Sequence, residues 1–192
     1  MKSKSKYLMT ALMIVGVAVG CSTTKEQSAT SEKADKLTSE ANAAKAEFLR
    51  QDPNLNTLLA RASGYAIFPS VGKGAVGVGG AAGKGQLYEA GRTYPLGQTE
   101  LMQLTVGFQA GGQAYSELIL FEDPVTLDNF KKGNFEFSAQ ATAVALRAGA
   151  SANARYEKGV MVFTIAKGGL MYEASVGGQK FSYSPYLTPT GY

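Results

Sequence analysis

Residues 101–121 read LMQLTVGFQAGGQAYSELILF, and this stretch indicates the fold class. Two runs of strand length, 101–110 and 113–121, flank the pair Gly111–Gly112. A glycine pair between two such runs is typical of a β-hairpin, because glycine adopts the positive φ angles that tight hairpin turns need. The stretch therefore predicts two antiparallel strands that are neighbours in a sheet.

The same arrangement of strands and glycine pairs recurs toward the C-terminus. Residues 159–166 (GVMVFTIA) predict a buried strand. The pairs Gly168–Gly169 and Gly177–Gly178 then predict turns that lead into strands at 170–176 and 180–183. Several short strands with regular turn signals are typical of an antiparallel sheet or a barrel.

A glycine-rich region precedes these strands. Residues 65–68 predict a short strand that Pro69 closes, and residues 74–81 (GAVGVGGA) predict a second strand by alternation. Residues 83–85 (GKG) predict a turn into a strand over 86–90. Because the strand at 74–81 has one face that is nearly bare, another part of the chain is expected to pack closely on it.

Helices are predicted at three places. The Asp–Pro pairs at 52–53 and 123–124 each open a short helix with an acidic N-cap, and Gly64 and Gly133 end these helices. Apolar residues recur at helical spacing between Ser31 and Phe48. The fold class is therefore predicted to be α+β, a single domain with a glycine-rich antiparallel sheet or partly closed barrel and two or three short helices.

The first 20 residues have the composition of an export signal. Lys2, Lys4 and Lys6 precede the uncharged run 7–19, which at roughly 13 residues is shorter than the about 20 that a spanning helix needs. Small residues then precede Cys21. Residues 1–20 are therefore predicted to be a signal peptide.

Residues 18–21 (AVGC) resemble the lipobox of bacterial lipoproteins, which implies that Cys21 carries lipid. The alternative is an ordinary signal peptide beside an unmodified cysteine. Cys21 is the only cysteine of the chain, so no intramolecular disulfide competes for it, and this favours the anchor. Ser22 resembles the residue found in lipoproteins sorted to the outer membrane, so the expected location is the periplasmic face of that membrane.

The polar stretch that follows is expected to be a flexible tether over residues 21–30. The folded domain with its N-terminal helix is expected over residues 31–186. Residues 187–192 are expected to form a loose tail.

The composition excludes several classes of function. Removing residues 1–20 takes three of the 19 basic residues and none of the 15 acidic ones, which leaves a net charge of +1. Nucleic acid is therefore not an expected partner, since domains that bind it carry a basic excess. The chain has no His, which excludes Ser-His-Asp and His-type zinc sites. Its glutamates are scattered singly, so we predict no enzyme, no cofactor and no metal site.

Two segments lack acidic residues and carry basic ones. Lys73 and Lys84 bracket the glycine-rich strand, and Arg147 and Arg155 lie in the second segment, 137–156. Exposed backbone amides and lysines together can hold an anionic head group. These residues are therefore candidates for binding lipid, although solvated turn residues would give the same pattern.

Several segments together resemble the SYLF-domain family of lipid-binding proteins. The similarity runs from Leu58 to Pro185 and includes ASGYAIFP at 62–69, the glycine-rich strand, and KGGL at 167–170 leading into ASVGG at 174–178. The resemblance implies a domain that binds acidic phospholipid membranes without catalysis. The expected function is a lipoprotein held on a membrane by its lipid, with acidic phospholipids as candidate ligands. The alternative is a structural or protein-interaction factor of the envelope that does not bind lipid through its fold; the sequence names no protein partner.

Overall fold

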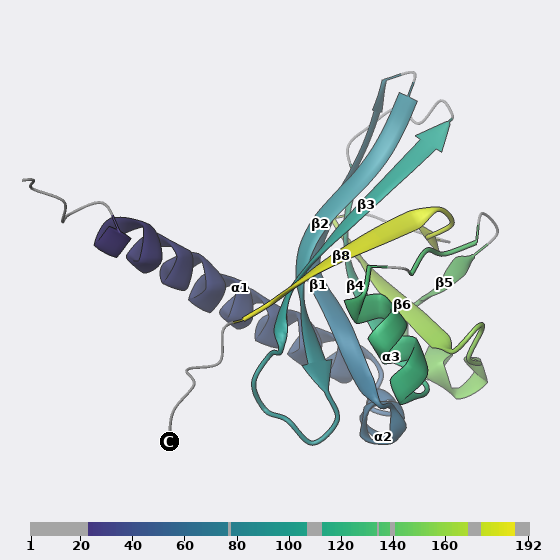
Figure 1. Ribbon diagram of the computed structural model, residues 1–192. Helices are drawn as coiled ribbons and strands as arrows, with labels where there is room; N and C mark the ends of the chain where they lie inside the picture. The colour runs from purple at the N-terminus through teal and green to yellow at the C-terminus, as the bar shows by residue number, and fades with distance from the viewer. Residues whose placement is uncertain are drawn as a thin grey trace, which may run out of the picture.

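The computed structural model describes residues 23–76, 78–106, 113–133, 135–138, 141–168 and 174–186. In this part of the chain one long helix and one sheet dominate (Figure 1). The helices are α1 (Thr23–Gln51), α2 (Leu55–Arg61), α3 (Pro124–Lys131) and the 3-10 helix η1 (Ala150–Asn153). The strands are β1 (Gly64–Val76), β2 (Val78–Glu89), β3 (Gly97–Val106), β4 (Gln113–Phe121), β5 (Thr142–Ala145), β6 (Val160–Lys167), β7 (Ala174–Ser175) and β8 (Gln179–Pro185).

The strands form one sheet in the order β7-β5-β6-β4-β1-β2-β3-β8. All its pairs are antiparallel except β5 with β6, which run parallel. The two strands at opposite ends of this order, β7 and β8, are separated in sequence only by residues 176–178. The sheet must therefore curl until its ends lie near each other, although no hydrogen-bonded ladder joins them within the described residues. The α+β single domain is confirmed, and the sheet is mixed and not closed. The prediction that residues 101–110 and 113–121 are neighbouring strands was wrong, because β1 and β2 lie between β4 and β3 in the sheet.

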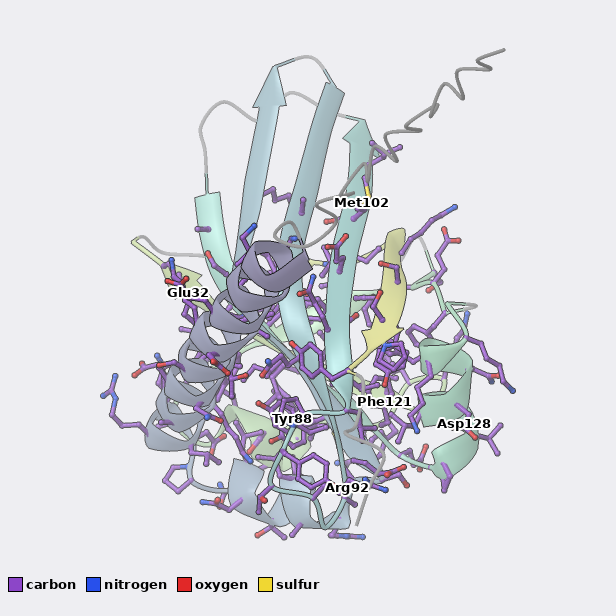
Figure 2. The ribbon with its side chains drawn as sticks, turned by 60° about the vertical axis from the view of Figure 1, so that its left-hand side comes forward. Glu32, Tyr88, Arg92, Met102, Phe121 and Asp128 are labelled. Carbon is purple, nitrogen blue, oxygen red and sulfur yellow. The ribbon has the colours of Figure 1, made fainter. Side chains whose placement is uncertain are left out.

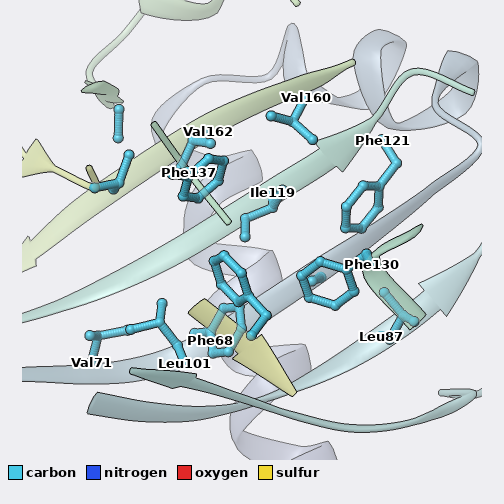
Figure 3. Close-up of a cluster of buried hydrophobic side chains, with 14 of the residues drawn as sticks. Phe68, Val71, Leu87, Leu101, Ile119, Phe121, Phe130, Phe137, Val160 and Val162 are labelled. Atoms are coloured by element: carbon cyan, nitrogen blue, oxygen red, sulfur yellow. The ribbon is translucent and has the colours of Figure 1, made fainter. Parts of the chain in front are cut away.

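The curled sheet has an inner and an outer face, and each carries its own core. The inner face packs Phe68, Leu101 and Ile119 against Phe130 of α3 and Phe181 of β8 (Figure 3). The outer face packs against α1 and α2, with these main contributors: Ala41, Phe48, Leu55, Ile67, Tyr88, Leu118, Leu120 and Phe163. Alternation along β2 and β4 supplies both cores, because successive side chains point to opposite faces of a strand.

The glycine-rich region differs from the prediction. Residues 74–81 do not form one strand; β1 and β2 are paired as a hairpin, with Val76 opposite Val78. The GKG at 83–85 is not a turn and lies inside β2. Its glycines serve close packing, because a Cβ on Gly85 would collide with Ile67 O and with the ring of Phe68. That contact arises where the register of β1 shifts between Ile67 and Ser70, at a β-bulge around Pro69.

Helix α1 begins earlier than predicted and is not short. It starts at Thr23, not at Ser31, so residues 23–30 of the expected flexible tether are helical. The residue types of this segment, Thr, Lys, Glu, Gln and Ala, are compatible with an α-helix. The turns packed at Leu37 and Ala41 have already nucleated the helix, so extending it toward the N-terminus costs little free energy. The signal peptide, Cys21 and the tail at 187–192 lie outside the described residues.

The two Asp–Pro pairs have different roles. Asp123 caps α3 as predicted: its Oδ1 accepts a hydrogen bond from Thr126 N at 2.8 Å. Asp52 does not cap α2, whose N-cap is Asn54. The Asp52 carboxylate is buried, accepts from Asn54 N at 3.1 Å, and accepts from Ser151 N of η1 at 2.8 Å. The helix-cap prediction for Asp52 was wrong because the sequence does not show that η1 returns to this corner.

Candidate functional site

The two lysines predicted to bind lipid lie on opposite faces of the sheet. Lys73 pairs with Ala81, a residue of the inner core, whereas Ser70 pairs with Lys84. Ala81 and Lys84 are three residues apart on β2, and an odd separation along a strand reverses the face. Lys73 is therefore half-buried on the inner face and Lys84 exposed on the outer face, where its Nζ lies 3.2 Å from Glu100 Oε1.

The two predicted arginines lie in the segment between β5 and β6. Both are exposed, and Arg155 lines a pocket. Its guanidinium donates to Ala154 O at 3.2 Å. The structure therefore does not gather Lys73, Lys84, Arg147 and Arg155 into one basic patch.

An exposed apolar surface extends the outer face beyond the region that α1 covers. Figure 1 shows β1, β2 and β3 running past the rest of the sheet, and we call the part formed by residues 72–76, 78–82 and 102–106 the arm. Pairing sets two rows across the outer face of the arm: Gly72, Ala82, Met102 and Gly74, Gly80, Leu104. Met102 is 66% exposed and Leu104 is 82% exposed.

The other positions in these two rows carry almost no side chain. A Cβ placed on Gly72 or Gly74 would meet no atom within 4 Å, so the backbone there faces open space on the outer side. The following row consists of Ser70, Lys84 and Glu100, and the row of Met102 continues into Lys180 of β8. The ion pairs Lys84–Glu100 and Lys180–Glu136 therefore both border the apolar rows. The arm therefore presents a flat apolar surface with a polar edge.

Helix α1 and the arm both project from the domain. Figure 1 shows α1 extending to the left and the arm extending to the top, and Figure 2 shows Met102 on the arm beyond the helix. Helix α1 crosses the outer face, where Gln86 Nε2 donates to Thr38 Oγ1 at 2.7 Å. Its first buried residue in the described part is Leu37, so residues 23–36 extend about 21 Å at 1.5 Å per residue. The helix begins two residues after Cys21 in the sequence.

A second surface feature is a pocket of about 340 Å³ beside the open edge of β6. Strand β5 pairs with β6 at Phe163 and Thr164, and Val160 bridges to Glu157, which leaves Met161 and Val162 without a paired strand on that side among the described residues. The pocket lies in this gap, and its apolar lining includes Phe135, Phe137, Ala141, Ala143, Val160 and Val162. Several of these residues belong to the inner core, so the pocket reaches the interior of the curled sheet from its side.

The inner face also contains a polar cluster, formed by Tyr115, Glu117, Thr164 and Gln179. Gln179 Nε2 donates to Tyr115 Oη at 3.1 Å and to Glu117 Oε2 at 3.0 Å. Glu117 is fully buried, and its Oε1 and the Oγ1 of Thr164 have no hydrogen-bond partner in the described part of the chain. Burial raises the pKa of Glu117 to about 8, although the hydrogen bond from Gln179 acts in the opposite direction.

Sequence reasoning missed the role of Glu117, which stood among the scattered glutamates. A signal was present: in QAYSELILF the residues Tyr115, Glu117, Ile119 and Phe121 alternate onto one face, and that face is apolar on either side of the carboxylate. The pocket had no such signal, because its walls come from segments that are distant in sequence.

None of the helices described is both long and apolar enough to cross a membrane. No protein-family model matches the chain. Among curated proteins, the chain is similar to "Beta cell expansion factor A" of Aeromonas veronii, with 28% identity over 161 residues. The similarity covers 78% of this chain and 57% of that protein, so the chain spans little more than half the length of this relative.

Proposed function

We propose that this chain is a lipoprotein anchored through Cys21 on the periplasmic face of the outer membrane, and that its folded domain binds the surface of acidic phospholipid membranes without catalysis. The resemblance to the SYLF-domain family is part of this proposal. The observation that carries it is the exposed pair Met102 and Leu104 on the bare outer face of the arm. Exposed apolar surface with a polar rim is typical of protein or membrane contact sites.

The position of α1 favours a membrane as the partner of this surface. An acylated Cys21 would lie two residues before α1, so the N-terminal end of the helix would be held at the bilayer. A plane that meets both projecting ends, α1 and the arm, would meet the arm on its outer face (Figure 1). Lys84 at the border of the apolar rows is paired with Glu100, so it would add less than the about 1 kcal/mol that an unpaired lysine contributes near an anionic surface.

The experiment uses the mature chain, residues 21–192, with Cys21→Ser so that no lipid attaches. Binding is measured by co-sedimentation with vesicles of phosphatidylglycerol and phosphatidylethanolamine, and with vesicles of phosphatidylcholine alone. We expect tighter binding to the anionic vesicles. Met102→Gln with Leu104→Gln should weaken binding about tenfold or more, because burying each side chain contributes about 1.5–3 kcal/mol.

Val125→Gln is the matched control, since Val125 is 69% exposed on α3 and lies away from the arm. Lys84→Gln should weaken binding to anionic vesicles more than Lys73→Gln does, because Lys73 lies on the inner face. Equal losses for the control and the arm variant would show that the arm is not the contact. Absence of binding to any vesicle would leave the alternative, an envelope factor that contacts protein.

A further inference from the structure

We propose that the pocket beside β6 takes up a single amphiphile, with one alkyl chain inside the pocket and an anionic head group at its rim. This goes beyond surface binding, because one molecule would leave the bilayer and enter the fold. The volume of about 340 Å³ lies within the range of about 300–1,000 Å³ typical of small-molecule sites. The part of the lining formed by Phe137, Val160 and Val162 is apolar and suits an alkyl chain.

The charge at the rim indicates an anionic head group. Four charged residues line the pocket: Glu136, Arg155, Glu157 and Lys158. Glu136 Oε2 already faces Lys180 Nζ at 3.5 Å, so its charge is compensated. Arg155 and Lys158 form no ion pair within the described residues, and both are exposed. Glu157 also forms no ion pair within the described residues, so the unpaired charges at the rim are two positive and one negative, a net charge of +1 that complements a carboxylate or a phosphate.

The backbone at Lys158 is a second and independent observation. Lys158 and Gly159 form the turn between Glu157 and Val160, which are bridged. The φ angles are positive at both turn residues, 52° at Lys158 and 81° at Gly159. In the described part of the chain Lys158 is the one residue other than glycine with positive φ. A lysine there is less favourable than Asn or Gly, which adopt this conformation at lower cost. Such a strained residue at a pocket rim suggests a role in binding.

The experiment measures uptake of amphiphilic probes by the mature chain with Cys21→Ser. Isothermal titration calorimetry is used below the critical micelle concentration of each probe. Laurate and lysophosphatidylglycerol are the two anionic probes, and they distinguish a free fatty acid from a phospholipid as the source. Dodecanol is the neutral probe. We expect saturable binding of at least one anionic probe, and weaker binding of dodecanol.

Two kinds of variant test separately the binding of the alkyl chain and the binding of the head group. Ala143→Leu and Ala141→Leu each fill the pocket and should abolish uptake of all three probes; two sites are used because the buried Ala143 tolerates extra volume less well. Lys158→Asn and Arg155→Gln should each weaken binding of the anionic probes about two- to fivefold, as for an exposed ion pair, and leave dodecanol unaffected. Arg147→Gln is the control outside the pocket.

Lys158→Asn has a further readout that a structural role would not give. Its melting temperature should equal or exceed that of the wild type while its affinity for anions falls, because Asn fits the positive φ better. The proposal is overturned if the wild type takes up neither anionic probe saturably, or if the folded alanine variants bind as the wild type does. Head-group recognition is overturned if Lys158→Asn and Arg155→Gln bind the anionic probe that the wild type takes up as tightly as the wild type does. Vesicle binding is measured without these probes, so failure of either proposal is distinguishable from failure of the other.

Discussion

The Glu117 carboxylate of β4 and the Gln179 carboxamide of β8 meet inside the curled sheet, with Gln179 Nε2 donating to Glu117 Oε2 at 3.0 Å. Glu117 and Gln179 are both fully buried, and no cation compensates Glu117 among the described residues. A buried carboxylate without a cation favours its neutral form. The contact therefore links β4 and β8 through a carboxyl group that titrates.

Stability should fall as the pH rises through the titration of Glu117. Its pKa is raised from 4.5 to about 8 in the folded protein, so the folded state holds a proton that the unfolded state has lost between these values. The stabilisation is full below about pH 4.5 and is lost as the pH approaches 8, a change on the order of a few kcal/mol. Thermal unfolding from pH 5 to pH 9 measures it.

Glu117→Gln should flatten this profile and raise the melting temperature at pH 8, since the amide cannot ionise. Glu136→Gln is the control, because Glu136 is exposed and pairs with Lys180. A Glu117→Gln variant that keeps the pH dependence of the wild type would contradict the assignment to this residue.

Removing the Asp52 carboxylate should destabilise the corner where α1 ends. Asp52→Ala leaves Ser151 N and Asn54 N without their acceptor in a buried site, which costs about 2–3 kcal/mol. Urea unfolding at pH 7 measures the loss, with Asp35→Ala on the exposed side of α1 as the control.

The same loss should depend on pH. Burial acts to raise the pKa of Asp52. The hydrogen bonds from Ser151, Asn54 and Gly149 lower it by more than burial raises it, so the pKa lies below its ordinary value. The stabilisation is therefore present above about pH 4 and is lost as the pH falls through the lowered pKa. If Asp52→Ala unfolded at the same urea concentration as the wild type, the contact with η1 would contribute nothing measurable.

Lipidation at Cys21 should determine membrane partitioning in cells. Cys21→Ser prevents acylation and should move the protein from the membrane fraction to the soluble fraction, because each buried CH2 of the lipid contributes about 0.8 kcal/mol. Fractionation and metabolic labelling with a fatty acid measure partitioning and acylation separately. Ser22→Asp is the matched variant, which should keep the lipid and shift the protein to the inner membrane. Cys21→Ser protein that stayed with membranes at wild-type levels would show that the folded domain is the attachment.

The sequence by itself determined the local elements. The alternation in QAYSELILF and GVMVFTIA and the Asp123–Pro124 start of α3 predict β4, β6 and α3 close to where they lie. The hairpin predicted from the glycine pair between residues 101–110 and 113–121 was wrong, because β1 and β2 lie between β4 and β3 in the sheet. These signals depend on side chains within one or two turns of the chain, so each is complete in the sequence. The signal pattern around Cys21 is of the same local kind, and it stays a prediction.

Only the tertiary structure decided which of these residues come together. The bulge between Ile67 and Ser70 changes which face the rest of β1 presents, and it places Lys73 and Lys84 on opposite sides of the sheet. The short β5 leaves the edge of β6 open, and the return of η1 buries Asp52. Strand register and long-range packing set these outcomes, and a one-residue shift in register reverses the face of every later side chain. The alternation in QAYSELILF indicates only which face Glu117 shares, and the fold decided that this face is buried. No pattern within a single strand predicts the pocket or the arm, and so both emerged only from the fold.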